Sequence, residues 1–246
     1  MSEKNSNFAE KFGIMRIGII VAMEKELRQL RALLDGEKID GRGAREFYTG
    51  SIGGNEVVIE QCGIGKVNSA VGAAEMIAGF APELVISTGV AGGASADLNI
   101  TEVVVARECA YHDAYCGKEC ELGRIMGMPA RYAAPTELID KALALNSLGH
   151  GLPRIHAGLT VTGDWFVDSK EKMRDILGHF PEAMAVDMES CSIAQTCHVY
   201  GVPFVSFRII SDIPLKDVDA AMYFNFWERI AKGSFEVTRA FLGQLA

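Results

Sequence analysis

Segments with the apolar pattern of a strand alternate along this chain with segments that have apolar residues at helical spacing. Short apolar runs, typical of buried strands, predict strands at 16–21, 83–88, 101–111, 155–162, 183–186 and 204–210, and segments of alternating character predict strands at 46–52 and 56–62. Stretches with apolar residues at helical spacing predict helices at 23–34, 67–80, 134–145, 168–177, 191–197 and 222–245. The second and third strands are separated only by Gly53-Gly54-Asn55, which predicts a hairpin that extends the main sheet. Strands and helices that alternate in this way indicate an α/β fold.

The stretch from Ala183 to Asp212 is the most informative part of the pattern. It predicts strand, helix and strand, with carboxylates directly after the first strand and at the end of the second. The second strand, 204–210, is nearly all apolar, as expected for a strand that is covered on both faces of a parallel sheet. Because open α/β sheets bind ligands outside the carboxyl ends of their strands, we expect a ligand site that includes Glu189 and Asp212.

Each of these carboxylates also has a purely structural interpretation. Asp212 would suit a helix cap, and Glu189 would complement the dipole at a helix start. Glu24 and Glu26 lie in the first turn of the first predicted helix, where carboxylates also stabilise the helix dipole. The presence of both Glu189 and Asp212 after paired strands favours a site over two unrelated structural roles.

Composition narrows the class of function. With 246 residues, 49% hydrophobic and 23% charged, the chain suits one globular domain with a sizeable core. Its formal net charge of −8, without clusters of Lys and Arg, argues against a nucleic acid or an anionic membrane as its partner. No apolar run approaches the roughly 20 residues of a membrane span. A small neutral or cationic ligand fits these properties better.

Six scattered cysteines, without CxxC pairs or a signal peptide, indicate a reduced cytoplasmic protein. His112, Cys116 and Cys120 are spaced by four residues. Gly117 disfavours a helix there, however, and a structural zinc site normally has four ligands, so no metal is predicted. Residues 1–14 are polar and aperiodic, and we expect them to form a flexible extension outside a domain that occupies 15–246.

Several motifs along the chain resemble those of the methylthioadenosine/S-adenosylhomocysteine nucleosidases, members of the nucleoside phosphorylase superfamily. V-D-M-E-S followed by R-I-I-S-D, in the stretch described above, is similar to the V-E-M-E-A and R-A-I-S-D motifs of these enzymes. The other motifs are I-G-I-I-x-A-M-E-x-E-L at Ile17–Leu27, G-I-G-K at Gly63–Lys66, T-G-x-A-G-G at Thr88–Gly93, Y-H-D-A at Tyr111–Ala114 and G-D-x-F at Gly163–Phe166. Each motif alone is a weak signal, whereas their order from about Met15 to the C-terminus is specific.

The resemblance implies a single domain with a mixed β-sheet flanked by helices, as in nucleoside phosphorylases. It implies hydrolysis of the N-glycosidic bond of adenine nucleosides, with release of adenine and a 5-substituted ribose. Methylthioadenosine and S-adenosylhomocysteine are the implied substrates, with 5′-deoxyadenosine as a further candidate. It also implies a homodimer whose partner chain helps to form the 5′ pocket, and no cofactor.

Cleavage of this bond requires a protonated leaving base, an activated water and a stabilised cationic sugar. By resemblance, Asp212 donates a proton to purine N7, Glu26 activates the water and Glu189 binds the ribose 2′- and 3′-hydroxyls. Glu24 matches a family position without a catalytic role. The resemblance places the ligand contacts at Ile64 and Met188 beside the sugar, Ala91 and Gly92 along the purine, Phe166 stacked on adenine, the Val167 backbone at its edge, Phe224 over the ligand, and Arg208 beside the carboxylates.

Three features depart from the family pattern. Val90 stands where the nucleosidases usually have Ser, and Asp187 stands where they commonly have Glu. The segment from Cys116 to Glu121 is more polar than the apolar segment that receives the 5′-thio group. These departures leave open the positioning of the water and the preferred 5′ substituent.

Two other functions compete with nucleoside hydrolysis. A phosphorylase of the same superfamily must bind phosphate, which requires positive charge and hydroxyl donors. The phosphorylases carry Arg and Ser in the loop that corresponds to residues 87–90, and this chain has neither that Arg nor the final Ser. Glu26 would also repel the dianion. A purine-binding relative without turnover is the second alternative, and the retention of Glu26, Glu189 and Asp212 argues against it.

Overall fold

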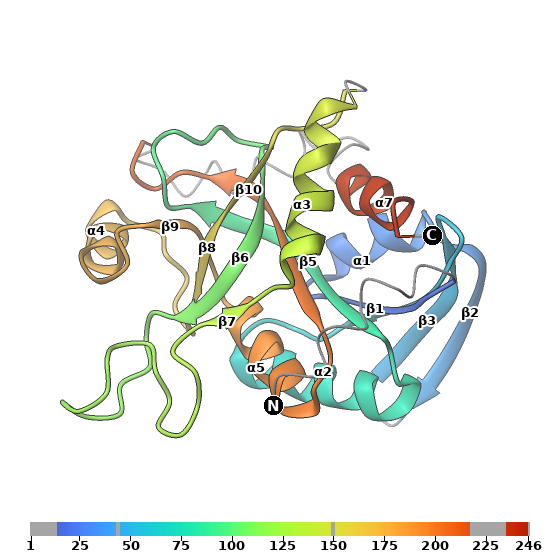
Figure 1. Cartoon of the computed structure of the whole chain (residues 1–246), viewed down its shortest axis with the longest axis horizontal. Coiled ribbons are helices and arrows are strands. Elements are labelled where there is room, and N and C mark those ends of the chain that lie inside the picture. Colours follow the sequence, from blue (N-terminus) through green and yellow to red (C-terminus); the bar gives the residue numbers. More distant parts are fainter. Residues whose placement is uncertain (1–13, 43–44, 149–150, 217–234, 246) are drawn as a thin grey trace.

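The computed structural model describes residues 14–42, 45–148, 151–216 and 235–245 (Figure 1). Its strands are β1 (Arg16–Val21), β2 (Asp35–Arg42), β3 (Arg45–Ile52), β4 (Asn55–Gln61), β5 (Leu84–Gly93), β6 (Val103–Tyr111), β7 (Tyr132–Ala133), β8 (Ile155–Thr162), β9 (Ala183–Asp187) and β10 (Phe204–Asp212). Its helices are α1 (Glu24–Arg31), α2 (Lys66–Phe80), α3 (Thr136–Ala144), α4 (Lys170–His179), α5 (Ser190–Tyr200) and α7 (Glu236–Leu242).

The strands form one mixed sheet in which β5 is the central element. It pairs in parallel with β1 and with β10, and antiparallel with β9 through Gly92 and Gly93. β10 continues to β6, β6 to β8 and β8 to β9, so these strands and β5 close into a ring (Figure 1). β1, β4, β3 and β2 extend from β5 as an open arm. The sheet is therefore mixed, as the sequence predicted, and it combines a closed ring with an open arm.

Helices cover the sheet on two sides. α1, α3 and α7 pack on the strands around a core that includes Leu30, Leu138 and Phe241. α2 and α5 pack together on the opposite side, where Met76 and Ile193 are fully buried. In Figure 1, α3 and α7 lie above the crossing strands while α2 and α5 lie below them. The two cores hold β5 and its neighbours from both sides.

All eight predicted strands are present, most with boundaries shifted by a few residues. The predicted hairpin is confirmed, because β3 and β4 pair antiparallel up to Ile52 and Asn55. β5 continues to Gly93, well past the predicted end at Thr88, because its small residues also pair as a strand. The sequence reading missed β2, whose polar sequence DGEKIDGR lacks the alternation of a half-buried strand.

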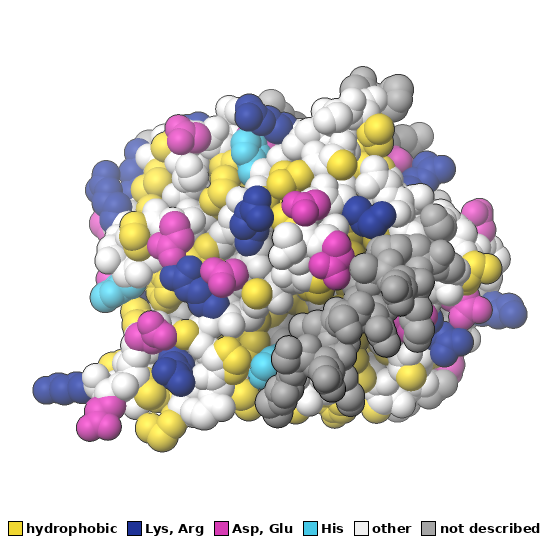
Figure 2. Space-filling model, in the orientation of Figure 1, with side chains coloured by type: hydrophobic (Ala, Val, Ile, Leu, Met, Phe, Trp, Pro, Cys, Tyr) yellow, Lys and Arg dark blue, Asp and Glu magenta, His cyan; other side chains and the backbone are white. Residues whose placement is uncertain are grey.

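Some predictions concern residues outside the described ranges. Only α7, at Glu236–Leu242, represents the helix predicted at 222–245. The extension predicted at 1–14 also lies outside them, apart from Ile14, and stays a prediction. Across the described ranges, no helix has both the length and the apolar character needed to cross a bilayer. Figure 2 shows basic and acidic side chains interspersed over the visible face.

Candidate active site

A pocket lies at the carboxyl ends of β1, β5, β9 and β10, where the sequence predicted a ligand site. It contains about 610 Å³ of space free of protein atoms, including solvent at its mouth. Glu26, Asp187, Glu189 and Asp212 are the acidic residues of its lining, and most of the other lining residues are apolar. A concave, mostly apolar site with a few convergent polar groups is typical of small-molecule binding.

Glu26 enters the pocket from the first turn of α1 and is almost completely buried. Its Oε2 accepts hydrogen bonds from the backbone N–H groups of Ala22 and Met23, at 3.0 and 2.9 Å. Its Oε1 accepts one from the backbone N–H of Val90, at 3.0 Å. Burial raises the pKa of Glu26 above its ordinary value, although these donors and the charge of Arg208 oppose the shift. A fixed carboxylate with a raised pKa is suited to accept a proton from water.

The Val90 contact bears on one of the departures from the family pattern. Val90 supplies a backbone N–H to Glu26, and this donor does not depend on the side chain at that position. The carboxylate is therefore fixed from β5 even though the usual Ser is absent.

Glu189 follows β9 and occupies the N-cap position of α5. Its side chain does not cap that helix, and Oε1 instead accepts a hydrogen bond from the backbone N–H of Gly65 at 2.9 Å. Burial, followed by the nearby charge of Asp187, raises the pKa of Glu189 to about 7, while Arg208 and the Gly65 N–H act in the opposite direction. Glu189 therefore connects the start of α5 with the turn before α2. The charge of Arg208 and the Gly65 N–H offset only part of the rise in its pKa.

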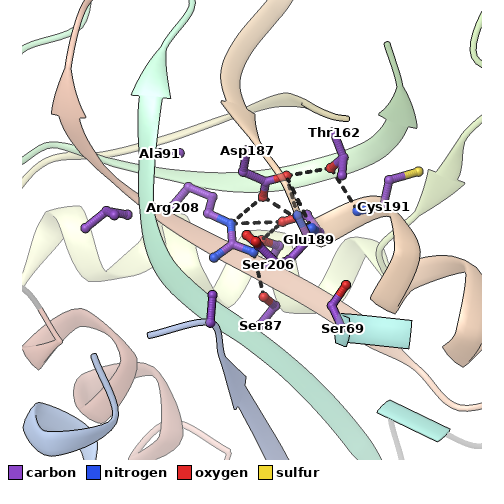
Figure 3. Close-up of polar contacts among 12 residues, drawn as sticks. Ser69, Ser87, Ala91, Thr162, Asp187, Glu189, Cys191, Ser206 and Arg208 are labelled. Atoms are coloured by element: carbon purple, nitrogen blue, oxygen red, sulfur yellow. Dashed lines mark hydrogen bonds and ion pairs between the residues drawn. The ribbon is translucent and has the colours of Figure 1, made fainter. Parts of the chain in front are cut away.

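Asp187, which belongs to the pocket lining, forms a buried ion pair with Arg208, which lies behind it (Figure 3). Arg208 Nε donates to Asp187 Oδ2 at 2.6 Å and to Ser190 Oγ at 2.9 Å, and Nη2 donates to Ser87 Oγ at 2.7 Å. Burial alone would lower the pKa of Arg208, but the charges of Asp187, Glu189 and Glu26 outweigh it and raise the pKa. Arg208 therefore stays charged and stabilises the anionic groups in front of it.

Asp187 also holds the start of α5. Its Oδ1 accepts from the backbone N–H groups of Glu189 and Ser190, at 3.3 and 3.2 Å, and from Thr162 Oγ1 (Figure 3). An Asp is long enough to make all these contacts while paired with Arg208. The shorter side chain at this position is therefore compatible with a fully bonded carboxylate.

Asp212 is the last residue of β10 and lines the pocket. Ser211 Oγ lies 2.6 Å from Asp212 Oδ1 and 3.2 Å from the carbonyl oxygen of Ala91. Within residues 213–216, the described segment that follows, no helix begins. The capping interpretation of Asp212 thus has no helix to act on in this segment.

Two loops bring apolar side chains to the pocket. Ile64 lies in the turn before α2, and Phe166 and Val167 follow β8. Ile64 and Phe166 are about half exposed, as expected for side chains at the mouth of a pocket. Met188 lies beside Glu189. An apolar surface of this kind suits a planar base and a sugar ring.

The pocket brings together nine of the eleven residues predicted for the site: Glu26, Ile64, Ala91, Gly92, Phe166, Val167, Met188, Glu189 and Asp212. Arg208 does not line it and acts through Asp187 instead. Phe224 lies outside the described residues. The sequence reading missed several lining residues, chiefly Trp165, Ala22 and Met23. Trp165 could have been predicted from the sequence, because it occupies the variable position of the G-D-x-F motif.

In the described part of the chain, no group of three or more His, Cys, Asp or Glu side chains is arranged so that it could hold a metal ion. The segment that contains His112, Cys116 and Cys120 is irregular in the structure, so the spacing by four does not place these side chains on one helix face.

Comparison with known proteins gives consistent matches over nearly the whole chain. The family model described as "Phosphorylase superfamily" matches residues 16–243. A 5′-methylthioadenosine/S-adenosylhomocysteine nucleosidase of Desulfotalea psychrophila is 40% identical over 232 residues, which are 94% of this chain and 98% of that protein. One from an Exiguobacterium species is 43% identical over 202 residues, covering 80% and 85%.

Solved structures agree with these matches. An S-adenosylhomocysteine nucleosidase from Streptococcus pyogenes, in complex with 5-methylthiotubericidin, superposes with a TM-score of 0.88 at 32% identity and covers 95% of this chain and 98% of its own. A 5′-methylthioadenosine/S-adenosylhomocysteine nucleosidase from Colwellia psychrerythraea, in complex with adenine, superposes with a TM-score of 0.87 at 34% identity, with 95% and 97% covered. The single-domain mixed sheet flanked by helices is common to this chain and these structures.

Proposed function

Because this chain belongs to the 5′-methylthioadenosine/S-adenosylhomocysteine nucleosidase family of the phosphorylase superfamily, we propose that it hydrolyses the N-glycosidic bond of adenine nucleosides. The products are adenine and a 5-substituted ribose. The observation that carries the proposal is the convergence of Glu26, Glu189 and Asp212 on one mostly apolar pocket. Methylthioadenosine and S-adenosylhomocysteine, named for the relatives, are the proposed substrates.

In the proposed mechanism each carboxylate has a separate role. Asp212 donates a proton to purine N7, so that adenine leaves as a neutral base. Glu26, fixed by three backbone N–H groups, accepts the proton of the attacking water. Glu189 binds the ribose hydroxyls, and its negative charge stabilises the oxocarbenium-like transition state. Phe166 and Val167 hold the base, while Ile64 and Met188 contact the sugar.

Hydrolysis is favoured over phosphorolysis by the charge of the pocket. None of its described lining residues is Lys or Arg. Arg208 is buried behind the pocket and already bonded to Asp187, Ser190 and Ser87. A phosphate dianion would therefore face the carboxylates of Glu26, Glu189 and Asp212, and the Arg208 cation is already paired with the fourth acidic lining residue, Asp187.

We further propose that the protein is a homodimer whose subunits meet beside the pocket mouth. Val67 and Val71 are exposed and lie on one face of α2, directly after the turn that carries the half-exposed Ile64. Tyr115 and Met126, in the irregular segment after β6, are also largely exposed. Exposed apolar side chains near a ligand site are suited to contact with a second subunit. A cytoplasmic location is proposed from the six free thiols.

The decisive experiment measures adenine release from methylthioadenosine, S-adenosylhomocysteine, adenosine and inosine, with and without phosphate. We expect release of adenine from the first two substrates at the same rate in both buffers. Strict dependence on phosphate would instead identify a phosphorylase. Absence of any base release from protein that binds adenine would identify a non-catalytic binding protein.

A further inference from the structure

Three charged residues that the proposed mechanism does not use meet at the edge of the pocket. Lys66 belongs to G-I-G-K, Asp113 to Y-H-D-A and Asp164 to G-D-x-F, so each comes from a different sequence motif. Lys66 Nζ donates to Asp113 Oδ2 at 2.7 Å and lies 3.8 Å from Asp164 Oδ2. The cluster is only partly exposed, since about a quarter of the Lys66 and Asp113 side chains is accessible.

Backbone groups connect the same residues. The Lys66 N–H donates to Asp164 Oδ1 at 2.8 Å, and the Asp164 N–H donates to Asp113 Oδ2 at 2.8 Å. The turn before α2 and the loop after β8 are therefore bonded to each other and to the segment after β6. These are the two loops that bring Ile64 and Phe166 to the pocket.

The cluster lies one residue from a contact with Glu189. Gly65, directly before Lys66, has a φ of 95°, a conformation that favours glycine, and its N–H donates to Glu189 Oε1. A Cβ at this position would lie 3.0 Å from Asp164 Oδ1, so the turn and the loop are already in close contact. The direction of the Gly65 N–H thus depends on the bonds made by its neighbour.

We propose that Lys66 is a positioning residue that, with Asp113 and Asp164, holds the Gly65 N–H against Glu189 and so sets the affinity for the ribose of the substrate. The inference rests on the proposed role of Glu189 in binding the ribose hydroxyls. Lys66 itself does not line the pocket. Its cation keeps Asp113 and Asp164 together, and without it their like charges would separate the loop after β8, which also binds the Lys66 N–H, from the segment after β6.

Loss of the cluster has an electrostatic consequence at Glu189. This carboxylate faces Asp187 of β9, Arg208 of β10 and Glu26 of α1, in addition to the Gly65 N–H. Burial raises its pKa, and the Gly65 N–H lowers it. If that donor turns away, the pKa of Glu189 rises further, and the ionised form that accepts ribose hydroxyls is lost at a higher pH.

The test compares Lys66→Met with Lys66→Arg. Lys66→Met keeps the aliphatic stem and removes the charge. We expect its KM for methylthioadenosine to rise about tenfold, the effect of losing one hydrogen bond to a charged group, with a smaller change in kcat. The acidic limb of its kcat/KM profile should move up by about half a pH unit. Lys66→Arg should retain values close to those of the wild type.

The matched control is Arg131→Met. Arg131 also pairs with two carboxylates, Glu108 and Glu182, but at a distance from the pocket lining. It should leave KM and the pH profile unchanged. The proposal is overturned if Lys66→Met changes only the melting temperature, or changes KM no more than Arg131→Met does. If Lys66→Met does not fold, Asp113→Asn provides the second variant and should change KM in the same direction.

A binding experiment separates this proposal from the proposed function. Calorimetry with adenine and with a 7-deaza analogue of methylthioadenosine measures affinity without turnover. Lys66→Met should weaken binding of the analogue about tenfold and leave adenine binding unchanged, because adenine has no ribose. Equal losses for both ligands, or none, would overturn the positioning role. Adenine release by the wild-type protein tests the proposed function independently.

Discussion

Asp212 is the residue on which the proposed chemistry depends most directly. Its carboxylate lines the pocket at the end of β10 and lies next to Ser211 Oγ. We expect Asp212→Asn to lower kcat by about 10²- to 10⁴-fold, because the amide cannot donate the proton that a general acid supplies. Steady-state adenine release with methylthioadenosine measures the effect.

The asparagine variant should remain folded and still bind the 7-deaza analogue. Its melting temperature should stay close to that of the wild type, since Asn retains hydrogen-bonding groups at this position. Near wild-type turnover in a folded Asp212→Asn variant would exclude Asp212 as the general acid, and Glu189 would then be the next carboxylate to substitute.

Glu60 is a buried carboxylate outside the pocket, and its environment predicts a pH-dependent stability. It is fully buried in β4, and both its oxygens have no hydrogen-bond partner among the described residues. Burial raises the pKa of Glu60 from 4.5 to about 7, although Arg45 opposes the shift. The folded protein therefore binds this proton more tightly than the unfolded chain. It should lose stability as the pH rises from about 4.5 to about 7.

Glu60→Gln removes the titration while keeping the shape of the side chain. At pH 8 we expect the variant to be more stable than the wild type by at most about 3 kcal/mol, the free energy that corresponds to the pKa shift. At pH 5 the difference should be much smaller. Denaturant unfolding at the two pH values measures both differences, and an equal difference at pH 5 and pH 8 would contradict the prediction.

Two of the predicted site residues that line the pocket, Glu189 and Asp212, belong to motifs at strand ends. Asp212 and Glu189 were located by the apolar runs that precede them, since a strand end fixes where a side chain emerges. The motifs did not distinguish residues that line the pocket from residues behind it. Arg208 is one example, because its separation from the pocket depends on an ion pair with Asp187 that only the folded sheet brings together.

At the scale of elements, β5 passes between two charged groups of the site. A Cβ at Gly89 would lie 2.6 Å from Glu26 Oε1 and 2.9 Å from Arg208 Nη1. Gly89→Ala should therefore displace the carboxylate that is proposed to activate water. We expect kcat/KM to fall by about 10²-fold, as for a displacement of about 1 Å at a reacting group.

A glycine in a different environment provides the control for Gly89. A Cβ at Gly178, in α4, would have no atom within 4 Å. Gly178→Ala should leave activity unchanged and should not destabilise the protein, because Ala favours a helix over Gly. Comparable losses of activity in both variants would indicate a general effect of replacing glycine.

The sequence did not predict strands that form through pairing with a neighbouring strand and that lack a local apolar pattern. β2 has the sequence DGEKIDGR, with one apolar residue, and it is a strand because β3 offers an unpaired edge. The apolar pattern also could not predict that the strands close into a ring, because the antiparallel pair of β10 and β6 joins segments distant in sequence. Local periodicity contains no information on such partners.

For the whole molecule, the proposed dimer gives a further prediction. Val71 is partly exposed on α2, one helical turn beyond the exposed Val67. We expect wild-type protein to elute as a dimer, and Val71→Glu to shift it towards monomer and to lower activity, because a charge in an apolar interface is costly. Size-exclusion chromatography with light scattering measures the change.

Ile39→Glu is the matched control, since Ile39 is an exposed apolar residue on β2, the edge strand that β3 separates from β4, against which α2 packs. It should leave the dimer intact. A wild-type protein that is strictly monomeric and fully active in dilute solution would refute the dimer proposal.

The central position of β5 also determines the order in which the site assembles during synthesis and folding. Ile86 in β5 is paired on one edge with Ile19 of β1 and on the other with Val205 of β10. During synthesis on a ribosome, β1, β5 and Glu26 are complete long before β10 and Asp212 are made. Pairings between such distant segments form slowly, because a long loop must close before they are gained. The nascent chain therefore acquires its proposed water-activating carboxylate early and its proposed proton donor late, so that the proposed catalytic pair is complete only with the last strand of the sheet.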